Sequence, residues 1–126
     1  MWDMFRIDED LTIHITRGDA AIFDVSAEDG EGAYTFVSGD VVRFNVHGKK
    51  DCDNVVLLKD FNAVAGEKFV TINLTKEDTK IGEFISKPTE YWYECVLNPD
   101  TQPQTFIGYD ENGAKVFRLY PEGGDE

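Results

Sequence analysis

The sequence predicts an all-β fold, a sandwich of two antiparallel sheets with seven to nine short strands and at most one short helix. Three observations lead to this prediction. Short segments alternate apolar and polar residues with a period of two, turn signals separate them, and only one segment has the spacing of a helix. Many short strands with frequent turns are typical of a sandwich or a small barrel, and we favour the sandwich.

The N-terminal half has the clearest alternation. Residues 11–16 and 42–47 carry an apolar residue at every second position, and Gly18-Asp19 and Gly39-Asp40 are turn signals beside them. Residues 21–25 form a further expected strand, and a short strand is expected at residues 34–37. The acidic, glycine-rich stretch 28–32 is expected to be a mobile loop.

The middle of the chain combines two strands with the one expected helix. Residues 55–58 are a continuous apolar run, which predicts a central strand covered on both faces, and residues 70–74 resume the alternation. Thr75 and Asp78 have the spacing of a helix cap. The apolar residues that would cover one face of this short helix are Ile81, Phe84 and Ile85.

The C-terminal part ends in an expected hairpin. Residues 91–97 are rich in aromatic and β-favouring residues and are expected to form a strand. Residues 105–109 and 115–120 flank Asn112-Gly113, a dipeptide that supplies the positive φ angles of a tight hairpin turn. We therefore expect a single domain over residues 1–121 and a disordered acidic tail at residues 122–126.

Charge and cysteine content restrict the classes of partner. The chain has 25 Asp and Glu against 12 Lys and Arg, a formal net charge of −13, so binding to nucleic acid or to an anionic membrane surface is not expected. The start of the chain lacks the pattern of a signal peptide, which favours a cytoplasmic location. Cys52 and Cys95 have no metal-binding or redox spacing, and we expect both to be reduced, although one disulfide stays possible on the sequence alone.

No catalytic site, metal site or cofactor is predicted. Serine or cysteine hydrolases need a nucleophile on a glycine-flanked turn beside a base, and His14 and His47 are the only imidazoles. His47 with Asp51, Cys52 and Asp53 matches no closed zinc site, and His14 is expected to face water. The acidic turns at residues 28–31 and 110–112 could supply calcium ligands but lack the EF-hand pattern. Paired carboxylates of a glycosidase cannot be recognised in so acidic a chain.

Tyr91, Trp92 and Tyr93 are the candidate interaction surface. Successive residues of a strand point to opposite faces, so Tyr91 and Tyr93 share one face and Trp92 takes the other. One face is expected to belong to the core. The aromatic side chains on the other face would then be available to a partner, because Tyr and Trp are favoured at protein interfaces.

Five segments together resemble a family of small proteins from tailed phages and prophages of Gram-positive gut bacteria. They are residues 11–19 (LTIHITRGD), 37–44 (VSGDVVRF), 74–79 (LTKEDT), 91–94 (YWYE) and 104–108 (QTFIG). This family is similar to the N-terminal immunoglobulin-like module of phage baseplate proteins, in which a Gly-Asp turn, a turn containing Asp-Thr and an aromatic strand follow in this order.

The resemblance implies an immunoglobulin-like sandwich and a structural role without catalytic residues. It predicts a baseplate- or tail-associated adaptor whose partners are other virion or tail proteins, and which moves from the cytoplasm of the host cell into the virion. Self-association through edge strands is a further possibility. The alternative function is a carbohydrate- or calcium-binding β-sandwich module, and a small hydrolase with paired carboxylates is the third class.

Overall fold

The computed structural model describes residues 5–29, 32–48, 55–81, 87–108 and 115–121. These residues contain eleven strands and no helix, which confirms the all-β prediction with more strands than expected. The larger sheet contains β1 (Phe5–Ile7), β2 (Ile13–Thr16), β6 (Val41–His47), β7 (Val55–Asn62), β9 (Thr89–Leu97), β10 (Gln104–Ile107) and β11 (Lys115–Tyr120). The smaller sheets pair β3 (Ala21–Val25) with β8 (Val70–Leu74) and β4 (Glu28–Asp29) with β5 (Gly32–Ala33).

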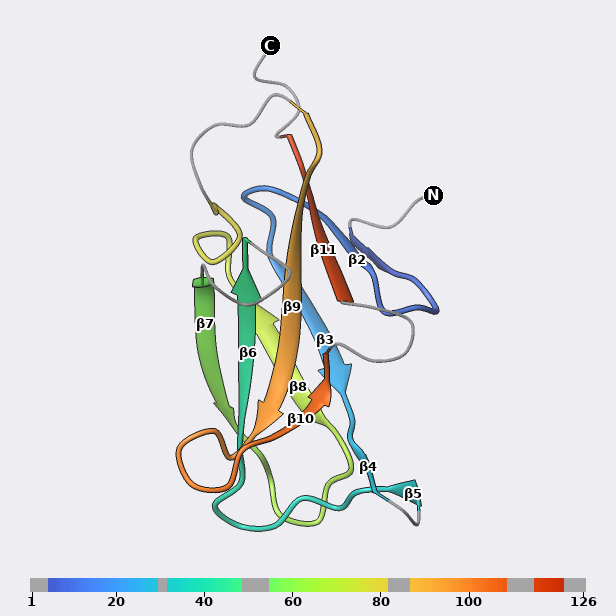
Figure 1. Cartoon of the computed structure of the whole chain (residues 1–126), viewed down its shortest axis with the longest axis vertical. Coiled ribbons are helices and arrows are strands. Elements are labelled where there is room, and N and C mark those ends of the chain that lie inside the picture. Colours follow the sequence, from blue (N-terminus) through green and yellow to red (C-terminus); the bar gives the residue numbers. More distant parts are fainter. Residues whose placement is uncertain (1–4, 30–31, 49–54, 82–86, 109–114, 122–126) are drawn as a thin grey trace.

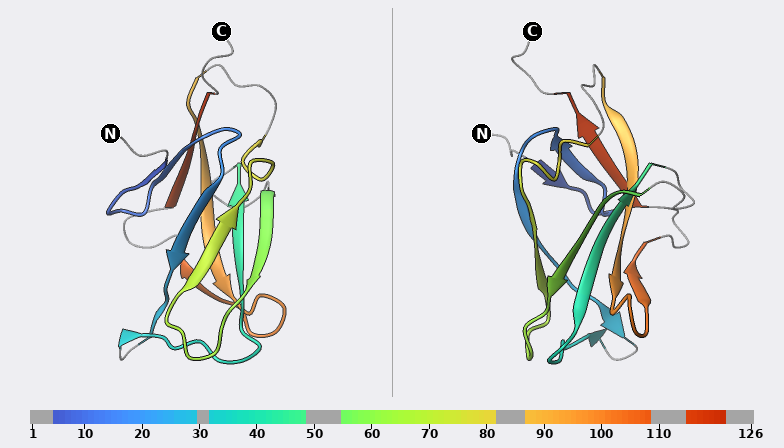
Figure 2. Two further views of the ribbon diagram at one scale, coloured as in Figure 1. Left: turned by 180° about the vertical axis from the view of Figure 1, so that it is seen from behind. Right: turned by 90° about the vertical axis from the view of Figure 1, so that its left-hand side faces the viewer.

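The β3–β8 pair packs behind the large sheet and forms the second layer of a β-sandwich (Figures 1 and 2). The strand order of the large sheet is β1-β2-β11-β9-β6-β7, and β10 pairs with the end of β9. Alternate residues of each strand point between the layers, so β6 buries Val42, Phe44 and Val46 while Arg43 and Asn45 face outward.

Aromatic rings fill the centre of the core. Phe44 is fully buried, and its ring centroid lies 6.0 Å from Phe23, 5.5 Å from Tyr93 and 6.3 Å from Phe117. These distances are typical of favourable tilted and edge-to-face ring pairs. The four rings come from β3, β6, β9 and β11, so they join both layers into one core.

One pair in the large sheet is parallel, which corrects the expectation of purely antiparallel sheets. β11 runs parallel to β2, with Phe117 opposite Ile13 and Leu119 opposite Ile15. The immunoglobulin-like assignment itself stays a prediction.

The prediction that residues 55–58 form a central strand is wrong. β7 lies at the edge of the large sheet, and Val55 and Leu58 are 48% and 49% exposed. The strand also continues to Asn62 with alternating half-buried and exposed residues. Its first residues have the continuous apolar sequence of a strand covered on both faces. In the structure, only one face is covered, because Leu57 faces the core while Leu58, beside it in sequence, faces out.

The expected helix is absent from its described part, residues 75–81. The predicted cap is present, because Thr75 Oγ1 accepts from the Asp78 amide and Asp78 Oδ2 accepts from the Thr75 amide. Only tight turns follow. The buried Thr79 hydroxyl donates to the Asp19 carbonyl and accepts from the Gly18 amide, which holds the chain against the turn after β2. Phe84 and Ile85 lie outside the described residues.

The C-terminal hairpin is also corrected. β10 pairs with β9, and β11 pairs with β9 and β2, so β10 and β11 are not partners. β9 is nine residues long, and it offers its first half to β11 and its second half to β10. The turn at Asn112-Gly113 and the tail at residues 122–126 lie outside the described residues.

Two shorter segments near the N-terminus differ from expectation. Residues 34–37 are not a strand, although the Phe36 amide donates to Glu67 and the Gly66 amide donates to Phe36. The stretch 28–32 is not only a loop, because Glu28 pairs with Ala33 and Asp29 with Gly32 in the β4–β5 ribbon. The turns at Gly18 and Gly39 are confirmed, and both glycines have positive φ angles, 89° and 91°.

Candidate functional site

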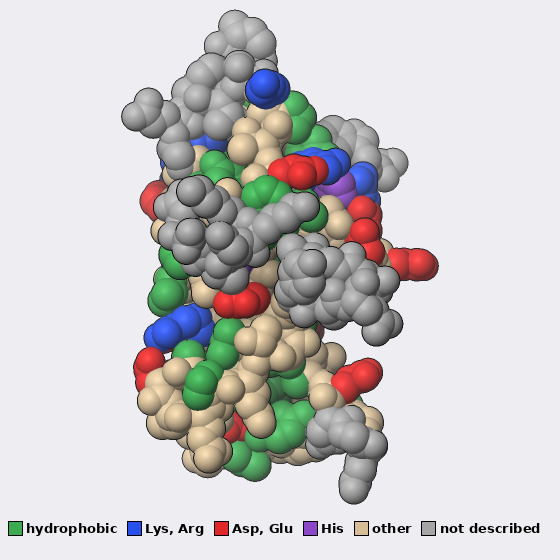
Figure 3. Space-filling view, in the orientation of Figure 1, with side chains coloured by type: hydrophobic (Ala, Val, Ile, Leu, Met, Phe, Trp, Pro, Cys, Tyr) green, Lys and Arg blue, Asp and Glu red, His purple; other side chains and the backbone are tan. Residues whose placement is uncertain are grey.

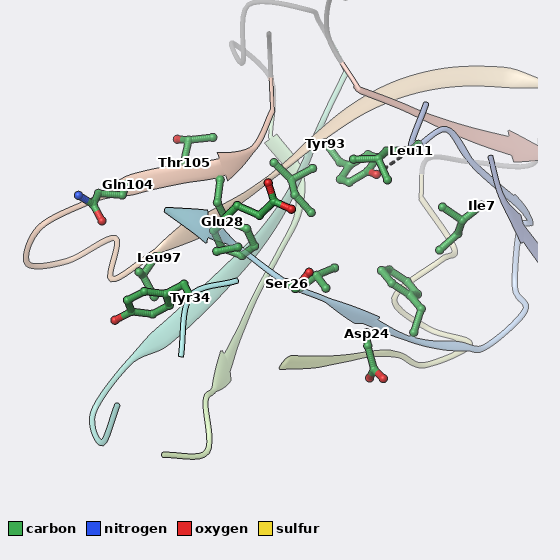
Figure 4. A pocket seen from close by; sticks show the side chains of 15 residues that line it. Ile7, Leu11, Asp24, Ser26, Glu28, Tyr34, Tyr93, Leu97, Gln104 and Thr105 are labelled. Atoms are coloured by element: carbon green, nitrogen blue, oxygen red, sulfur yellow. Dashed lines mark hydrogen bonds between the residues drawn. The ribbon is translucent and has the colours of Figure 1, made fainter. Parts of the chain in front are cut away.

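A groove of about 760 Å³ opens between the two layers on the side of the sandwich away from β7. We call it the edge groove. It is lined by residues 23–28, which belong to β3 and the chain leading into β4, and by residues 104–107 of β10. Tyr34, Tyr93 and Leu97 complete the middle, and Ile7 and Leu11 lie at one end (Figure 4).

The edge groove runs along the edges of strands rather than over a face. Its lining includes consecutive residues of β3 and all four residues of β10. Neighbouring residues of a strand point to opposite faces, so a surface that touches all of them must follow the strand edge. Among the described residues, β3 is hydrogen-bonded in a sheet with β8 alone and β10 with β9 alone. Two strand edges therefore border one groove.

The base of the edge groove is held by Tyr93. Its side chain is 4% exposed, and its hydroxyl donates a hydrogen bond to the Leu11 carbonyl (Figure 4). Burial raises the pKa of this phenol above its ordinary value. Leu11 has a φ of 71°, in the left-handed region that a leucine rarely adopts. The tyrosine thus ties down a strained residue at the end of the groove.

The rim of the edge groove is polar and carries negative charge. Asp24 and Glu28 are exposed carboxylates on one side, and Gln104 and Thr105 are exposed neutral side chains on the other. Asp24 accepts a hydrogen bond from Thr71. The arrangement offers an apolar interior with a rim that favours basic groups.

Tyr34 connects the groove to a buried carboxylate. Its hydroxyl donates to Asp40 Oδ2 at 2.9 Å, and the same oxygen accepts from the Val37 amide at 2.9 Å. Asp40 Oδ1 accepts from Asn98 Nδ2 at 3.0 Å. Burial acts to raise the pKa of Asp40, but these three hydrogen bonds outweigh it and hold that pKa below its ordinary value.

The structure separates the three aromatic residues predicted as an interaction surface. Tyr93 belongs to the core and Tyr91 packs against it, whereas Trp92 lies on the outer face of the large sheet opposite Val116 and His47. The predicted alternation of these side chains is therefore confirmed. Only Trp92 points away from the core, and its role as a contact residue stays a prediction.

A hydrogen-bonded chain of side chains that the sequence did not indicate lies on the outer face of β1, β2 and β11. His14 Nδ1 lies 2.8 Å from the Tyr120 hydroxyl, and its Nε2 lies 2.8 Å from Asp8 Oδ2. The bond with His14, aided by Arg6, lowers the pKa of Asp8. His14 is half-buried rather than fully solvated, because the parallel β2–β11 pairing brings Tyr120 beside it. Nothing in the sequence pattern indicates that pairing.

The other predicted groups separate in the same way. Cys95 is a free thiol in the core, and burial raises its pKa to about 12, so it is a packing residue rather than a nucleophile. Cys52, Asp51, Asp53, residues 30–31 and residues 110–112 lie outside the described part of the chain. Within the described part, no three His, Cys, Asp or Glu side chains come close enough to hold a metal ion.

Comparisons with known proteins add no identification. No family model, no curated protein and no solved structure matches the chain. The phage-protein resemblance therefore rests on the sequence motifs alone. In the described ranges, no helix has the length and apolar character needed to cross a membrane.

Proposed function

We propose that the chain is a non-catalytic interaction module of a phage or prophage tail assembly, and that it captures an extended segment of a partner protein in the edge groove. The observation that carries the groove part of this proposal is the pair of strand edges that border it, β3 and β10. Extended segments bind readily to free strand edges, because backbone hydrogen bonds supply affinity and alternate side chains supply specificity.

The chemistry of the lining indicates the kind of segment. The interior offers apolar contacts from Val25, Leu97 and Ile107, while Asp24 and Glu28 stand at the rim. A segment that alternates apolar residues with Lys or Arg would place its apolar side chains inward and its cations beside these carboxylates. The net charge of −13 would speed the approach of such a basic partner.

Selection from a library of random peptides tests the groove. We expect enrichment of sequences with alternating apolar and basic residues. Their affinity should fall by about tenfold or more in a Thr105→Arg variant, a loss of at least about 1.4 kcal/mol, because Arg blocks the rim and repels cations. Thr101→Arg adds the same group at an exposed position outside the groove and should bind normally. Absence of enrichment, or equal loss in both variants, contradicts the groove proposal.

The tail-assembly part of the proposal needs a separate test, because it is supported by the motifs at residues 11–19, 74–79 and 91–94 rather than by the groove. Mass spectrometry of particles purified after prophage induction in the source bacterium should detect the chain at a fixed ratio to tail proteins. Its absence from purified particles would remove the assembly role and leave the groove proposal standing.

A glycan is the second candidate ligand, and the mixed lining of the groove is what favours it. Tyr34 is a half-buried aromatic residue, and Asp24, Glu28 and Gln104 supply the carboxylate and amide groups that hydrogen-bond sugar hydroxyls. A glycan array separates the two candidates. Binding of glycans that Thr105→Arg weakens, without any selected peptide, would favour the carbohydrate-binding alternative.

A further inference from the structure

A second strand edge lies on the opposite side of the sandwich. The large sheet runs β1-β2-β11-β9-β6-β7, so β7 is one border, while β1 and β10, which pairs with the end of β9, lie on the other side. Among the residues that the structure describes, β7 pairs with β6 alone, and it forms the outer left border in Figure 1. β7 is eight residues long. A long edge strand without a partner is a template for pairing with another chain.

The charges on β7 are already compensated within the chain. Lys59 Nζ lies 2.6 Å from Asp78 Oδ2, and Asp60 accepts two hydrogen bonds from Arg43, at 2.8 and 3.1 Å. Charged side chains usually protect an edge strand against pairing. Here they leave a locally neutral border on a molecule with a net charge of −13. This border can therefore approach a second copy more easily than the rest of the surface can.

The apolar side chains of β7 lack the cover that a further strand would give. Leu58 faces outward and is 49% exposed, while Leu57 and Phe61 face the core and stay only half-buried at this border of the sheet. An added strand would cover apolar atoms on both faces at once. Burial of such atoms favours association, because it removes apolar surface from water.

We propose that two copies of the chain pair through β7, antiparallel, about a two-fold axis at Leu58. A two-fold axis perpendicular to the sheet keeps side chains of one face of β7 on that same face in both copies. In an antiparallel pair with such an axis, the residue on the axis lies opposite the same residue of the second copy. Axes at Lys59 or Asp60 would place like charges opposite one another, which destabilises a strand pair. The axis at Leu58 places leucine against leucine and puts Lys59 opposite Leu57 of the second copy.

Light scattering after size exclusion, across a concentration series, tests the dimer. We expect a mass that approaches twice that of the chain as concentration rises. Leu58→Lys should raise the dissociation constant by more than about tenfold, because it removes two buried leucines and opposes two cations. Ile22→Lys is the matched control, since Ile22 is 61% exposed on β3, and it should dimerise normally. A monomer at every concentration, or equal weakening by both substitutions, overturns the proposal.

Cysteine cross-linking tests the register. Opposite Cα atoms in an antiparallel pair are about 4.5–5.5 Å apart, a distance that a disulfide can span. In a Cys52→Ser background, Leu58→Cys should form a disulfide-linked dimer under mild oxidation. Asp60→Cys, on the same face, should not, because it would lie opposite Val56 of the second copy. A dimer that cross-links through position 60 and not through 58 overturns the proposed axis. These variants leave the edge groove intact, so failure here is distinct from failure of the groove proposal.

Discussion

Leu11 combines backbone strain with a place in the candidate site. A left-handed φ of 71° costs a leucine about 1–2 kcal/mol relative to an ordinary conformation. The surrounding structure sustains this cost, because the Tyr93 hydroxyl holds the Leu11 carbonyl. Strained residues of this kind cluster at ligand-binding sites. At Leu11, backbone strain therefore coincides with a place in the lining of the candidate site.

Substitution of Leu11 should invert the usual order of glycine and alanine. Leu11→Ala keeps the strain and loses the side chain, whereas Leu11→Gly also relieves the strain. We expect the glycine variant to be more stable than the alanine variant by about 1 kcal/mol in urea unfolding. Both variants should bind groove-selected peptides more weakly than the natural sequence does. Equal or greater stability of the alanine variant would contradict the strain argument.

Asp40 is expected to be needed as a carboxylate. Its carboxylate accepts three hydrogen bonds, from the Tyr34 hydroxyl, the Val37 amide and the Asn98 side-chain amide. Asn at this position would turn an amide donor toward one of them, so Asp40→Asn should lower the free energy of unfolding by about 1–3 kcal/mol at pH 7. Asp100→Asn, at an exposed position, should have little effect.

The pH dependence of the same variant has a definite sign. The folded-state pKa of Asp40 lies below its ordinary value of 3.8. The charged carboxylate therefore contributes stability that is present above pH 3.8 and is lost as pH falls through the lowered pKa. Urea unfolding from pH 7 to pH 2 should show the natural sequence losing more stability than Asp40→Asn below pH 3.8. Parallel curves would mean that Asp40 does not contribute through its charge.

At the scale of the elements, one lysine closes the side of the sandwich opposite the edge groove. Lys59 of β7 donates to the Asn73 carbonyl on the border of β8 at 2.8 Å and to Asp78 at 2.6 Å. Burial acts to raise the pKa of Asp78, but the hydrogen bonds from Lys59 and Thr75 outweigh it and lower that pKa. The two layers are thus joined at β7 and β8, while the β3 side stays open.

Removal of this bridge should loosen β7 from β8. Lys59→Met keeps most of the aliphatic stem and loses both hydrogen bonds, so we expect the free energy of unfolding to fall by about 1–2 kcal/mol. The pKa of Asp78, followed by NMR titration, should rise toward its ordinary value. Lys76→Met, at an exposed position in the same turn, is the control and should change neither quantity. An unchanged Asp78 pKa in Lys59→Met would contradict the bridge.

Sequence patterns predicted where the strands lie better than which strands pair with one another. Sequence patterns correctly placed residues 21–25, 42–47, 70–74 and 115–120 in strands, because a strand with one buried face carries its own period. Pairing depends on distant segments, so the parallel β2–β11 contact and the β9–β10 pair carried no local signal. The edge position of β7 and the two strand edges that border the groove also depend on how distant strands pair. This is why the sequence did not indicate the candidate site.

At the scale of the whole molecule, the two proposed binding borders lie on opposite sides of one sandwich. The edge groove follows β3 and β10, and the dimer border is β7. Acidic side chains are spread over the outer face of the large sheet rather than gathered in one patch (Figure 3). Because β7 lies on the side opposite the edge groove, a dimer through β7 would carry two grooves pointing away from the shared axis. Such a two-sided unit can link two copies of a partner, as an adaptor does.

Ionic strength should separate the two borders, because charge acts on them in opposite directions. Two chains of net charge −13 repel one another, and the charges on β7 are paired within each chain, so added salt should screen the repulsion and tighten the dimer. A basic peptide is attracted by Asp24, Glu28 and the overall charge, so the same salt should weaken groove binding. Dissociation constants for both processes, measured from about 0.01 M to about 1 M salt, should change in opposite directions.

If salt weakened both, the dimer would depend on ion pairs between copies rather than on the apolar edge of β7. If salt strengthened both, the acidic rim would have no part in recognising the partner.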